Sequence, residues 1–498
     1  MQELPEKYSI ASDSEIERAM DKARNAYLDY RNLTGKVRAG FLDAIADEIM
    51  ALGDLLVKQA CAETGLPEAR IIGERGRTVN QLRMFSELLR EGSWTEASID
   101  TAIPGRLPVP KPDLRLLLRP IGPVVVFSAS NFPLAYSTAG GDTASALAAG
   151  NPVIVKAHPS HPGTNLLIGE AINNAAIKTG MPDGVFSTLY STGYELGLAL
   201  VKHPVTKAVG FTGSFSGGMA LYRAAMEREE PIPVFAEMGS VNPVILLPEK
   251  IRTDAGSLAK TMAISVTTGA GQFCTNPGLM AAIEGNDLNR FIKLFSDEID
   301  AVNSQTMLNK GIWDSYNSNR SKVLGAKGVE LVAGHRADSE VAQGRPAIAV
   351  VNYSDFAANR NLHEEVFGPF SLLVKCKNRS ELEGFAQLIK GQLTVSLFAE
   401  GNDFDEYSTL FGLVEDKAGR LIINGPPTGV EVCPSIQHGG PFPSTTDSRF
   451  TSVGTGAIRR FVRPVAYQNV PQHLLPDELK DANPLKIWRR YNGKIGRE

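Results

Sequence analysis

At 498 residues the chain is too long for one hydrophobic core, and its length predicts two or three domains. Its hydrophobic fraction of 43%, charged fraction of 21% and formal net charge of -4 are ordinary for a globular protein. Lysine and arginine are spread along the chain, which argues against a nucleic-acid partner, and no apolar run reaches membrane-spanning length. The N-terminus does not resemble a signal peptide, and the four cysteines form no CxxC pair, so we expect a cytoplasmic protein with reduced thiols and no metal site.

The first hundred residues are predicted to be mainly helical. Apolar residues recur at helical spacing over 13–32, with Asp13 or Ser14 as the cap, and further helices are expected over 37–63 and 68–91. The proline-rich stretch 103–113 is typical of an extended connector or an edge segment, because proline cannot donate to a central strand ladder.

From residue 121 onward, short apolar runs alternate with helical stretches. Strands are predicted over 121–127, 151–156, 185–190, 206–213 and 242–247, with helices over 137–149, 162–179, 193–202 and 216–229. Strands that are apolar throughout indicate a parallel sheet covered on both faces, whose ligands bind at the carboxyl ends of the strands. The chemistry is therefore expected just after residues 127, 156 and 211.

Beyond residue 250 a similar alternation indicates a second α/β domain. The expected helices are 253–268, 285–302 and 379–389, and the expected strands are 348–352, 370–375, 393–398 and 420–424. Apolar and polar residues alternate over 457–467, which predicts one further strand.

Three polar residues stand in positions that suit catalysis. Cys274 lies in GAGQFCTNPG, whose glycines would leave the thiol open to a substrate, although a lone cysteine is more often a small buried side chain. Glu237 lies between two apolar runs and fits a general base, either partly buried with a raised pKa or pointing into a cleft, or else a surface turn. Asn131 follows the strand 121–127, where its amide could stabilise an oxyanion or simply form a turn before Pro133.

Two further strand ends suit a phosphate-bearing ligand. The TGS turn at 212–214 ends a strand and opens a helix, where backbone N–H groups bind phosphate. Lys156 ends the strand 151–156, although a charged strand end needs no ligand to explain it. The GxGxxG motif is absent, so neither position identifies a cofactor by itself.

Several short motifs nevertheless occur in the order and with the spacing of one enzyme family. They are ETGLP (63–67), NFPL (131–134), GNPVIVK (150–156), FTGS (211–214), EMGSVNP (237–243), GQFC (271–274) and EEVFGP (364–369). On these motifs the chain resembles the aldehyde dehydrogenase superfamily over residues 10–465. KAHPSHPGTN (156–165) and HGGPFPSTTDSRF (438–450) resemble one branch, the α-ketoglutaric semialdehyde dehydrogenases and their NADP-preferring fatty-aldehyde relatives.

The resemblance implies a role for each catalytic candidate. Cys274 is expected to add to the aldehyde carbon, while the Asn131 amide and the Cys274 backbone N–H stabilise the oxyanion. Hydride then leaves for the nicotinamide, and a thioester remains. Glu237 is expected to activate the water that hydrolyses this thioester, and since CoA-acylating relatives lack this glutamate, its presence implies water as the acyl acceptor.

The resemblance also implies an NAD or NADP site. The expected cofactor residues are Ser128, Lys156, Gly213, Ser214, Glu365 and Phe367. Lys156 is assigned to the adenosine ribose or its 2′-phosphate, the 213–214 turn to the pyrophosphate, and Glu365 and Phe367 to the nicotinamide ribose and ring. Pro159 stands where many NAD-specific members carry a glutamate that would repel a 2′-phosphate, so NADP+ is expected to be accepted. His158 and His161 lie nearby, with turn packing as their alternative role.

The implied architecture is two doubly wound α/β domains plus a small β oligomerisation element. Residues 1–108 and 120–236 are assigned to a cofactor-binding domain and 237–450 to a catalytic domain. Residues 109–119 and 455–470 are assigned to the oligomerisation element, and 471–498 to a C-terminal tail. Because the bridging strand of the family pairs with a neighbouring subunit, a homodimer or homotetramer is expected.

The substrate stays open at this point, between α-ketoglutaric semialdehyde and a medium- or long-chain fatty aldehyde. An ω-oxo acid needs a cation, for which Arg77, Arg83 and Arg449 are candidates, whereas a fatty aldehyde needs an apolar tunnel. Ala139-Gly140 replaces a tryptophan-lysine pair of many members, which widens the tunnel. Outside this class, a cysteine hydrolase without redox chemistry and a non-catalytic binding protein are the alternatives.

Overall fold

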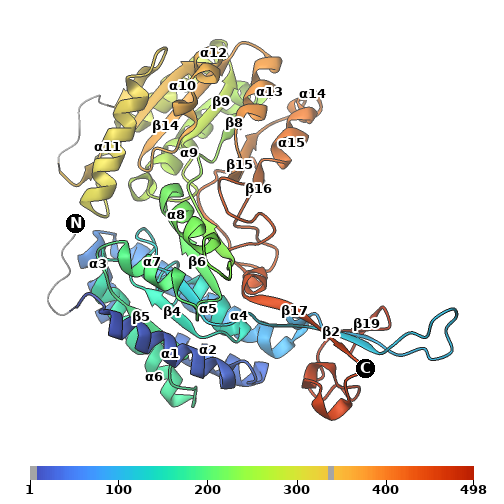
Figure 1. Ribbon diagram of the computed structural model, residues 1–498. Coiled ribbons are helices and arrows are strands. Elements are labelled where there is room, and N and C mark those ends of the chain that lie inside the picture. The colour runs from blue at the N-terminus through green and yellow to red at the C-terminus, as the bar shows by residue number, and fades with distance from the viewer. Residues whose placement is uncertain (1–7, 335–340, 498) are drawn as a thin grey trace.

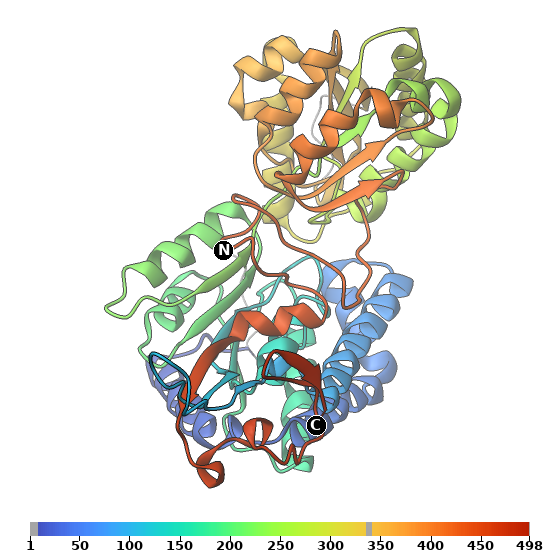
Figure 2. The ribbon, with the colours of Figure 1, turned by 90° about the vertical axis from the view of Figure 1, so that its right-hand side faces the viewer.

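The computed structural model describes residues 8–334 and 341–497, which form two lobes with a β-rich arm beside the lower one (Figures 1 and 2). The chain builds the lower lobe first, crosses to the upper lobe, and returns to the arm (Figure 2). Within these ranges no helix is long and apolar enough to cross a membrane. The α/β class predicted from the alternating pattern is confirmed.

The lower lobe is built on a parallel sheet in the order β5-β4-β3-β6-β7. Its strands are β3 (Val124–Phe127), β4 (Val153–Lys156), β5 (Phe186–Leu189), β6 (Ala208–Thr212) and β7 (Val234–Glu237). Its helices are α1 (Asp13–Tyr30), α2 (Gly35–Ala51), α3 (Gly53–Thr64), α4 (Glu68–Glu91), α5 (Gly141–Ala149), α6 (Pro162–Lys178), α7 (Glu195–Lys202) and α8 (Phe215–Met226). One apolar core packs helices α2, α3, α4, α5 and α6 against one face of the sheet. Another packs helices α1, α7 and α8 against the opposite face.

The upper lobe is built on a larger sheet in the order β11-β13-β14-β9-β8-β15-β16, in which β11 alone is antiparallel to its neighbour among the described pairings. Its strands are β8 (Val244–Leu246), β9 (Leu279–Ile283), β11 (Glu330–Gly334), β13 (Ala347–Asn352), β14 (Phe370–Cys376), β15 (Gln392–Phe398) and β16 (Ala418–Ile423). Its helices are α9 (Pro248–Thr267), α10 (Asn286–Asp300), α11 (Lys310–Leu324), α12 (Tyr353–Ala358), α13 (Arg379–Leu388), α14 (Asp403–Glu406) and α15 (Ser408–Glu415). Separate apolar cores cover its two faces, so both lobes are layered as predicted.

The arm is a third sheet in the order β17-β2-β1-β18-β19 (Figure 1). It contains β1 (Ser98–Asp100), β2 (Leu114–Pro120), β17 (Val462–Gln468), β18 (Arg489–Tyr491) and β19 (Lys494–Gly496). The pairing of β2 with β17 joins the two segments predicted to meet here. The C-terminal residues also enter this sheet, because β18 pairs with β1 and with β19.

Three local predictions are wrong for identifiable reasons. The single helix expected over 37–63 is interrupted at Gly53, whose φ of 52° is left-handed and separates α2 from α3. The strand expected over 457–467 begins only at Val462, after a 3-10 helix over Thr455–Phe461. The first helix is capped by Ser12, which forms a reciprocal capping box with Glu15, and not by Asp13 or Ser14.

Candidate active site

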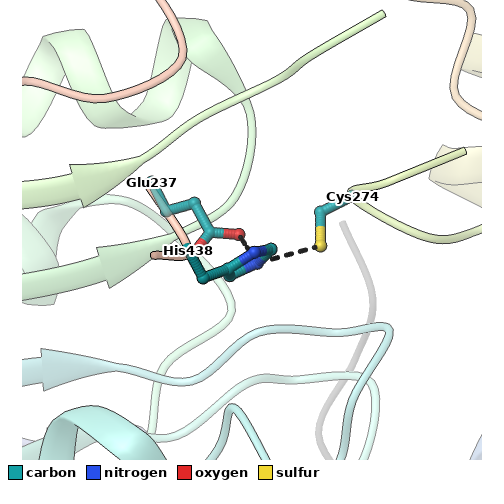
Figure 3. Close-up of side chains that lie close together, drawn as sticks. All are labelled: Glu237, Cys274 and His438. Carbon is teal, nitrogen blue, oxygen red and sulfur yellow. Dashed lines mark hydrogen bonds and ion pairs between the residues drawn. The ribbon is translucent and has the colours of Figure 1, made fainter. Parts of the chain in front are cut away.

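Cys274, Glu237 and His438 come from three separate parts of the chain and meet between the lobes (Figure 3). Glu237 is the last residue of β7, whose carboxyl end faces the upper lobe. Cys274 lies on the turn that follows α9 and precedes β9, and His438 lies on the long return segment after β16. The predicted nucleophile and the predicted base are therefore neighbours, and a histidine stands between them.

One imidazole nitrogen faces both partners. His438 Nε2 lies 3.1 Å from Glu237 Oε1 and 3.6 Å from Cys274 Sγ. The side chains of His438 and Glu237 are only 1% and 2% exposed, so this contact is shielded from water. The Ser452 hydroxyl donates a hydrogen bond of 2.6 Å to Glu237 Oε2 and fixes the other carboxylate oxygen.

These contacts set the protonation of the thiol and the carboxylate. Burial, with the adjacent Glu237 charge, raises the pKa of the Cys274 thiol well above its usual value. Burial also acts to raise the pKa of Glu237, but His438 and the Ser452 hydroxyl outweigh it, and the pKa of this carboxyl is lowered. The raised pKa considered for a buried Glu237 is therefore wrong in direction, because His438 and Ser452 lie more than 200 residues away along the chain and could not be recognised as its partners.

The cysteine turn is held by hydrogen bonds and by a close backbone approach. Asn242 Nδ2 donates to the carbonyl oxygens of Cys274 and Asn276, at 2.8 and 2.9 Å. Gly271 has a φ of 63°, and a Cβ there would lie 2.3 Å from the carbonyl carbon of Gly368. Because only glycine fits, the turn packs directly against the EEVFGP segment, while Cys274 keeps part of its surface accessible.

Asn131 lies beside the same turn. Its Nδ2 donates to the carbonyl oxygen of Gln272 at 3.1 Å, which leaves the second amide hydrogen free to face a substrate. Arg70 donates to the Asn131 carbonyl at 2.9 Å, and its guanidinium packs over the rings of Phe132 and Phe273. The Asn131 amide therefore lies beside the turn that carries Cys274.

The expected cofactor residues lie along the carboxyl edge of the lower sheet. Ser128 follows β3, and its Oγ is buried without a hydrogen-bond partner, which suits an added ligand. Lys156 ends β4; burial lowers its pKa to about 8, and its Nζ donates to the Ser191 carbonyl at 3.3 Å. The Ser214 side chain caps α8, whose N-terminus opens beside Gly213.

The EEVFGP segment reaches the same region from the upper lobe. A Cβ on Gly239 would lie 2.3 Å from a carboxylate oxygen of Glu365, so this glutamate packs on the turn that follows Glu237. Burial raises the pKa of Glu365 to about 7. Phe367, two residues further on, is half-buried.

The two histidines near Lys156 serve mainly to pack the turn. Their rings stack at 5.5 Å, and His161 Nε2 lies 2.9 Å from the Ala129 carbonyl oxygen. Burial lowers the pKa of both His158 and His161, so both are neutral near pH 7. Neither adds a positive charge for a phosphate.

A family model described as "Aldehyde dehydrogenase family" matches residues 2–449. The chain belongs to the aldehyde dehydrogenase family. It is 51% identical over 488 residues to alpha-ketoglutaric semialdehyde dehydrogenase 2 of Azospirillum brasilense, covering 98% of this chain and 93% of that protein. It is 46% identical to an alpha-ketoglutaric semialdehyde dehydrogenase of Acinetobacter baylyi, with the same coverage of both chains. A salicylaldehyde dehydrogenase from Pseudomonas putida G7 has the same fold, with a TM-score of 0.79 and 19% sequence identity. The match covers 93% of this chain and 91% of that chain.

In this NAD(P)-dependent aldehyde dehydrogenase, His438 is a functional candidate that the sequence reasoning missed. His438 stands at the start of HGGPFPSTTDSRF, where a histidine beside two glycines was a visible but unspecific signal. It lies 164 residues from Cys274 along the chain, so no local pattern could pair them.

The thiol, imidazole and carboxylate of this dehydrogenase also offer three ligand atoms of the types that zinc prefers, all within 4.8 Å of one another. A bound metal would occupy the predicted nucleophile and the predicted base, so the predicted roles of Cys274 and Glu237 need both groups to be free of metal.

Proposed function

We propose that this aldehyde dehydrogenase oxidises α-ketoglutaric semialdehyde to 2-oxoglutarate, with Cys274 as nucleophile and water as the acyl acceptor. The contact of Cys274 with His438 and Glu237 carries the mechanism, because it supplies a nucleophile, a proton acceptor and a base in one buried site. The two relatives named for this semialdehyde support the substrate.

The first proposed step is the activation of the thiol. A thiol with a raised pKa is protonated near pH 7 and needs a base in order to attack. In the tautomer whose hydrogen is on Nδ1, His438 Nε2 takes this proton as Sγ bonds to the aldehyde carbon and the carbonyl electron pair becomes an alkoxide. The new N–H on Nε2 then donates to the Glu237 carboxylate. Asn131 and the Cys274 backbone N–H then stabilise the alkoxide.

The second proposed step is oxidation followed by hydrolysis. A nicotinamide cofactor held by Glu365 and Phe367 would supply the hydride acceptor, and loss of hydride from the alkoxide leaves a thioester on Cys274. Glu237 then removes a proton from a water molecule that attacks the thioester. A cavity of about 20 Å³ beside Glu237 and His438, lined also by Ser452 and Thr451, is large enough for about one water molecule.

The test of this function is a substrate panel in which reduced cofactor is followed by its absorbance. α-Ketoglutaric semialdehyde should be oxidised with a higher kcat/KM than succinic semialdehyde or decanal, and the product should be the free acid. If decanal is the best substrate, the fatty-aldehyde alternative replaces the semialdehyde.

Replacing His438 by asparagine is expected to lower kcat/KM about 100-fold at pH 7, because the thiol loses its proton acceptor. The pH profile should change as well. In the variant the rate depends on the thiolate fraction, and since burial raises the pKa of the Cys274 thiol, kcat/KM should keep rising as the pH increases above neutrality.

The matched control for this change is His473→Asn, at an exposed position of the C-terminal segment, which should leave the rate and the profile unchanged. A His438→Asn enzyme with the wild-type pH profile would show that His438 only positions Cys274 or Glu237.

We propose that the cofactor site uses Ser128, Lys156 and the 213–214 turn for the adenosine half, and Glu365 and Phe367 for the nicotinamide half. The unpartnered Ser128 hydroxyl and the open N-terminus of α8 support the first group. NADP+ is proposed to be a good cofactor, because Lys156 supplies a positive charge below about pH 8.

Pro159→Glu is expected to lower kcat/KM for NADP+ at least about 10-fold while leaving that for NAD+ within about 3-fold. The introduced carboxylate would repel a 2′-phosphate and could bind ribose hydroxyls instead. Initial rates with both cofactors at fixed aldehyde measure the ratio, and NAD+ serves as the internal control. Equal losses for the two cofactors would contradict the assignment of the 2′-phosphate site.

We further propose the division into a cofactor-binding domain (1–108 and 120–236), a catalytic domain (237–450) and an oligomerisation element (109–119 and 455–470). β17 forms one edge of the small sheet, and β16 forms an edge of the upper sheet with Leu421 and Ile423 exposed. Pairing of β17 with the β16 edge of a second copy would cover both edges and give a homodimer or a tetramer of dimers. Free cysteines throughout the described chain support a cytoplasmic location.

The thiol–imidazole–carboxylate arrangement favours one second activity at the same site, the hydrolysis of activated esters without cofactor. An ester would acylate Cys274 directly, and the deacylation step would be the one already proposed for the thioester.

A further inference from the structure

Arg77 on α4 and Arg420 on β16 are two cations with incomplete partners. The Nε of each is buried without a hydrogen-bond acceptor. Arg77 donates through Nη2 to the Tyr136 hydroxyl at 3.1 Å, and Arg420 donates through Nη2 to the carbonyls of Pro427 and Gly429. No carboxylate of the described chain forms a salt bridge with either one. A buried N–H without an acceptor is costly, so an anionic ligand that accepts from these groups would stabilise both side chains.

Both arginines lie near the reactive thiol. The charge of Arg77 acts on Cys274 against the larger effect of burial, and lowers the pKa of that thiol. Arg420 pairs in β16 with Thr394 of β15, whose hydroxyl donates to Asn242 at 3.0 Å, and Asn242 donates to the Cys274 carbonyl at 2.8 Å. Burial lowers the pKa of Arg420, and the nearby Cys274 and Tyr136 oppose this shift. Tyr136 thus lies within the reach of both charges, and its ring is 6.1 Å from that of His438. Arginines from both lobes therefore lie in the neighbourhood of Tyr136 and Cys274.

The other arginines considered for this role are already occupied. Arg83 pairs with Asp47, and Arg449 pairs with Asp447, on the protein surface. Arg70 also lies near Cys274, but its guanidinium packs over two phenylalanine rings and bonds to the Asn131 carbonyl. Of the three candidates named from the sequence, only Arg77 approaches the thiol, and Arg420 was not foreseen.

We infer that Arg77 and Arg420 bind the carboxylate of an ω-oxo acid whose aldehyde carbon lies against Cys274 Sγ, and that they set the specificity for such substrates. This inference rests on the proposed function. A guanidinium presents a planar fork of donors that matches a carboxylate. Because Tyr136 accepts a hydrogen bond from Arg77, its own hydroxyl proton is free to donate to the 2-oxo group or to the same carboxylate.

The experiment compares two five-carbon substrates, α-ketoglutaric semialdehyde and pentanal, which lacks the carboxylate. Arg77→Gln and Arg420→Gln are each expected to lower kcat/KM for the semialdehyde about 100-fold, mainly through KM, and to leave pentanal within about 3-fold. Arg77→Lys should recover part of the loss, because it restores the charge but not the fork. Arg83→Gln, on the same helix with its partner on the surface, is the matched control and should behave as wild type.

A second measurement separates failure of this inference from failure of the proposed function. 2-Oxoglutarate should inhibit pentanal oxidation by the wild type, and at least about 10-fold more weakly in both glutamine variants. Equal losses for both substrates together with unchanged inhibition would overturn the carboxylate site, whereas the proposed substrate would stand. If the wild type prefers pentanal but 2-oxoglutarate still binds through the arginines, the proposed substrate fails and the carboxylate site stands.

Discussion

Cys274→Ala is expected to lower kcat for aldehyde oxidation by at least about 10⁴-fold with either cofactor, because neither the C–S bond nor the thioester can form without the thiol. The loss should appear in the formation of reduced cofactor and in the esterase activity together, since both reactions pass through the same nucleophile. Cofactor binding, measured by the quenching of protein fluorescence, should be the same as in the wild type.

Cys61→Ala is the matched control for this prediction. Cys61 is also a free, half-buried thiol, but it lies on α3, away from Glu237 and His438. The variant should retain activity to within about 2-fold. If Cys274→Ala oxidised aldehydes like the wild type, the assignment of Cys274 as the nucleophile would be wrong.

The fold was largely predictable because buried parallel strands leave a strong local signal. The apolar runs of β3 and β4 are each flanked by residues that favour loops or helices. The bounds of both strands were therefore predicted to within three residues. β7 was missed because VFAE is short and ends on a charged residue that sequence reasoning treats as exposed. In the fold, Glu237 is buried because His438 and Ser452 satisfy it, and these partners are more than 200 residues distant.

The site was predictable only as far as residues signal their role locally. The glycines around Cys274 and the strand end before Asn131 are visible in the sequence. The contact of His438 with the thiol, and the approach of Arg77 and Arg420 to the same space, depend on how the return segment and β16 of the upper lobe meet the lower lobe. An arginine whose Nε is buried without an acceptor cannot be distinguished in the sequence from one that is solvated.

Glu237→Gln should separate the two halves of the reaction. With the hydrolytic base removed, the steady-state rate is expected to fall about 10³-fold, while the first turnover still produces reduced cofactor. Rapid mixing should therefore show a burst close to one equivalent per active site, and the mass of the intact protein should reveal an acyl group on Cys274.

Ser452→Ala is the control, since it keeps the carboxylate and removes only the hydrogen bond to Oε2. This variant should lower the steady-state rate far less than Glu237→Gln and should not accumulate the acyl-enzyme.

Loss of the burst in Glu237→Gln would show that Glu237 is needed before the thioester forms. His438 Nε2 contacts both the thiol and the Glu237 carboxylate, so an enzyme without a burst would need Glu237 already for thiol activation. In that case the proton of Cys274 would pass through the imidazole to the carboxylate, and Glu237 would act before hydride transfer as well as after it.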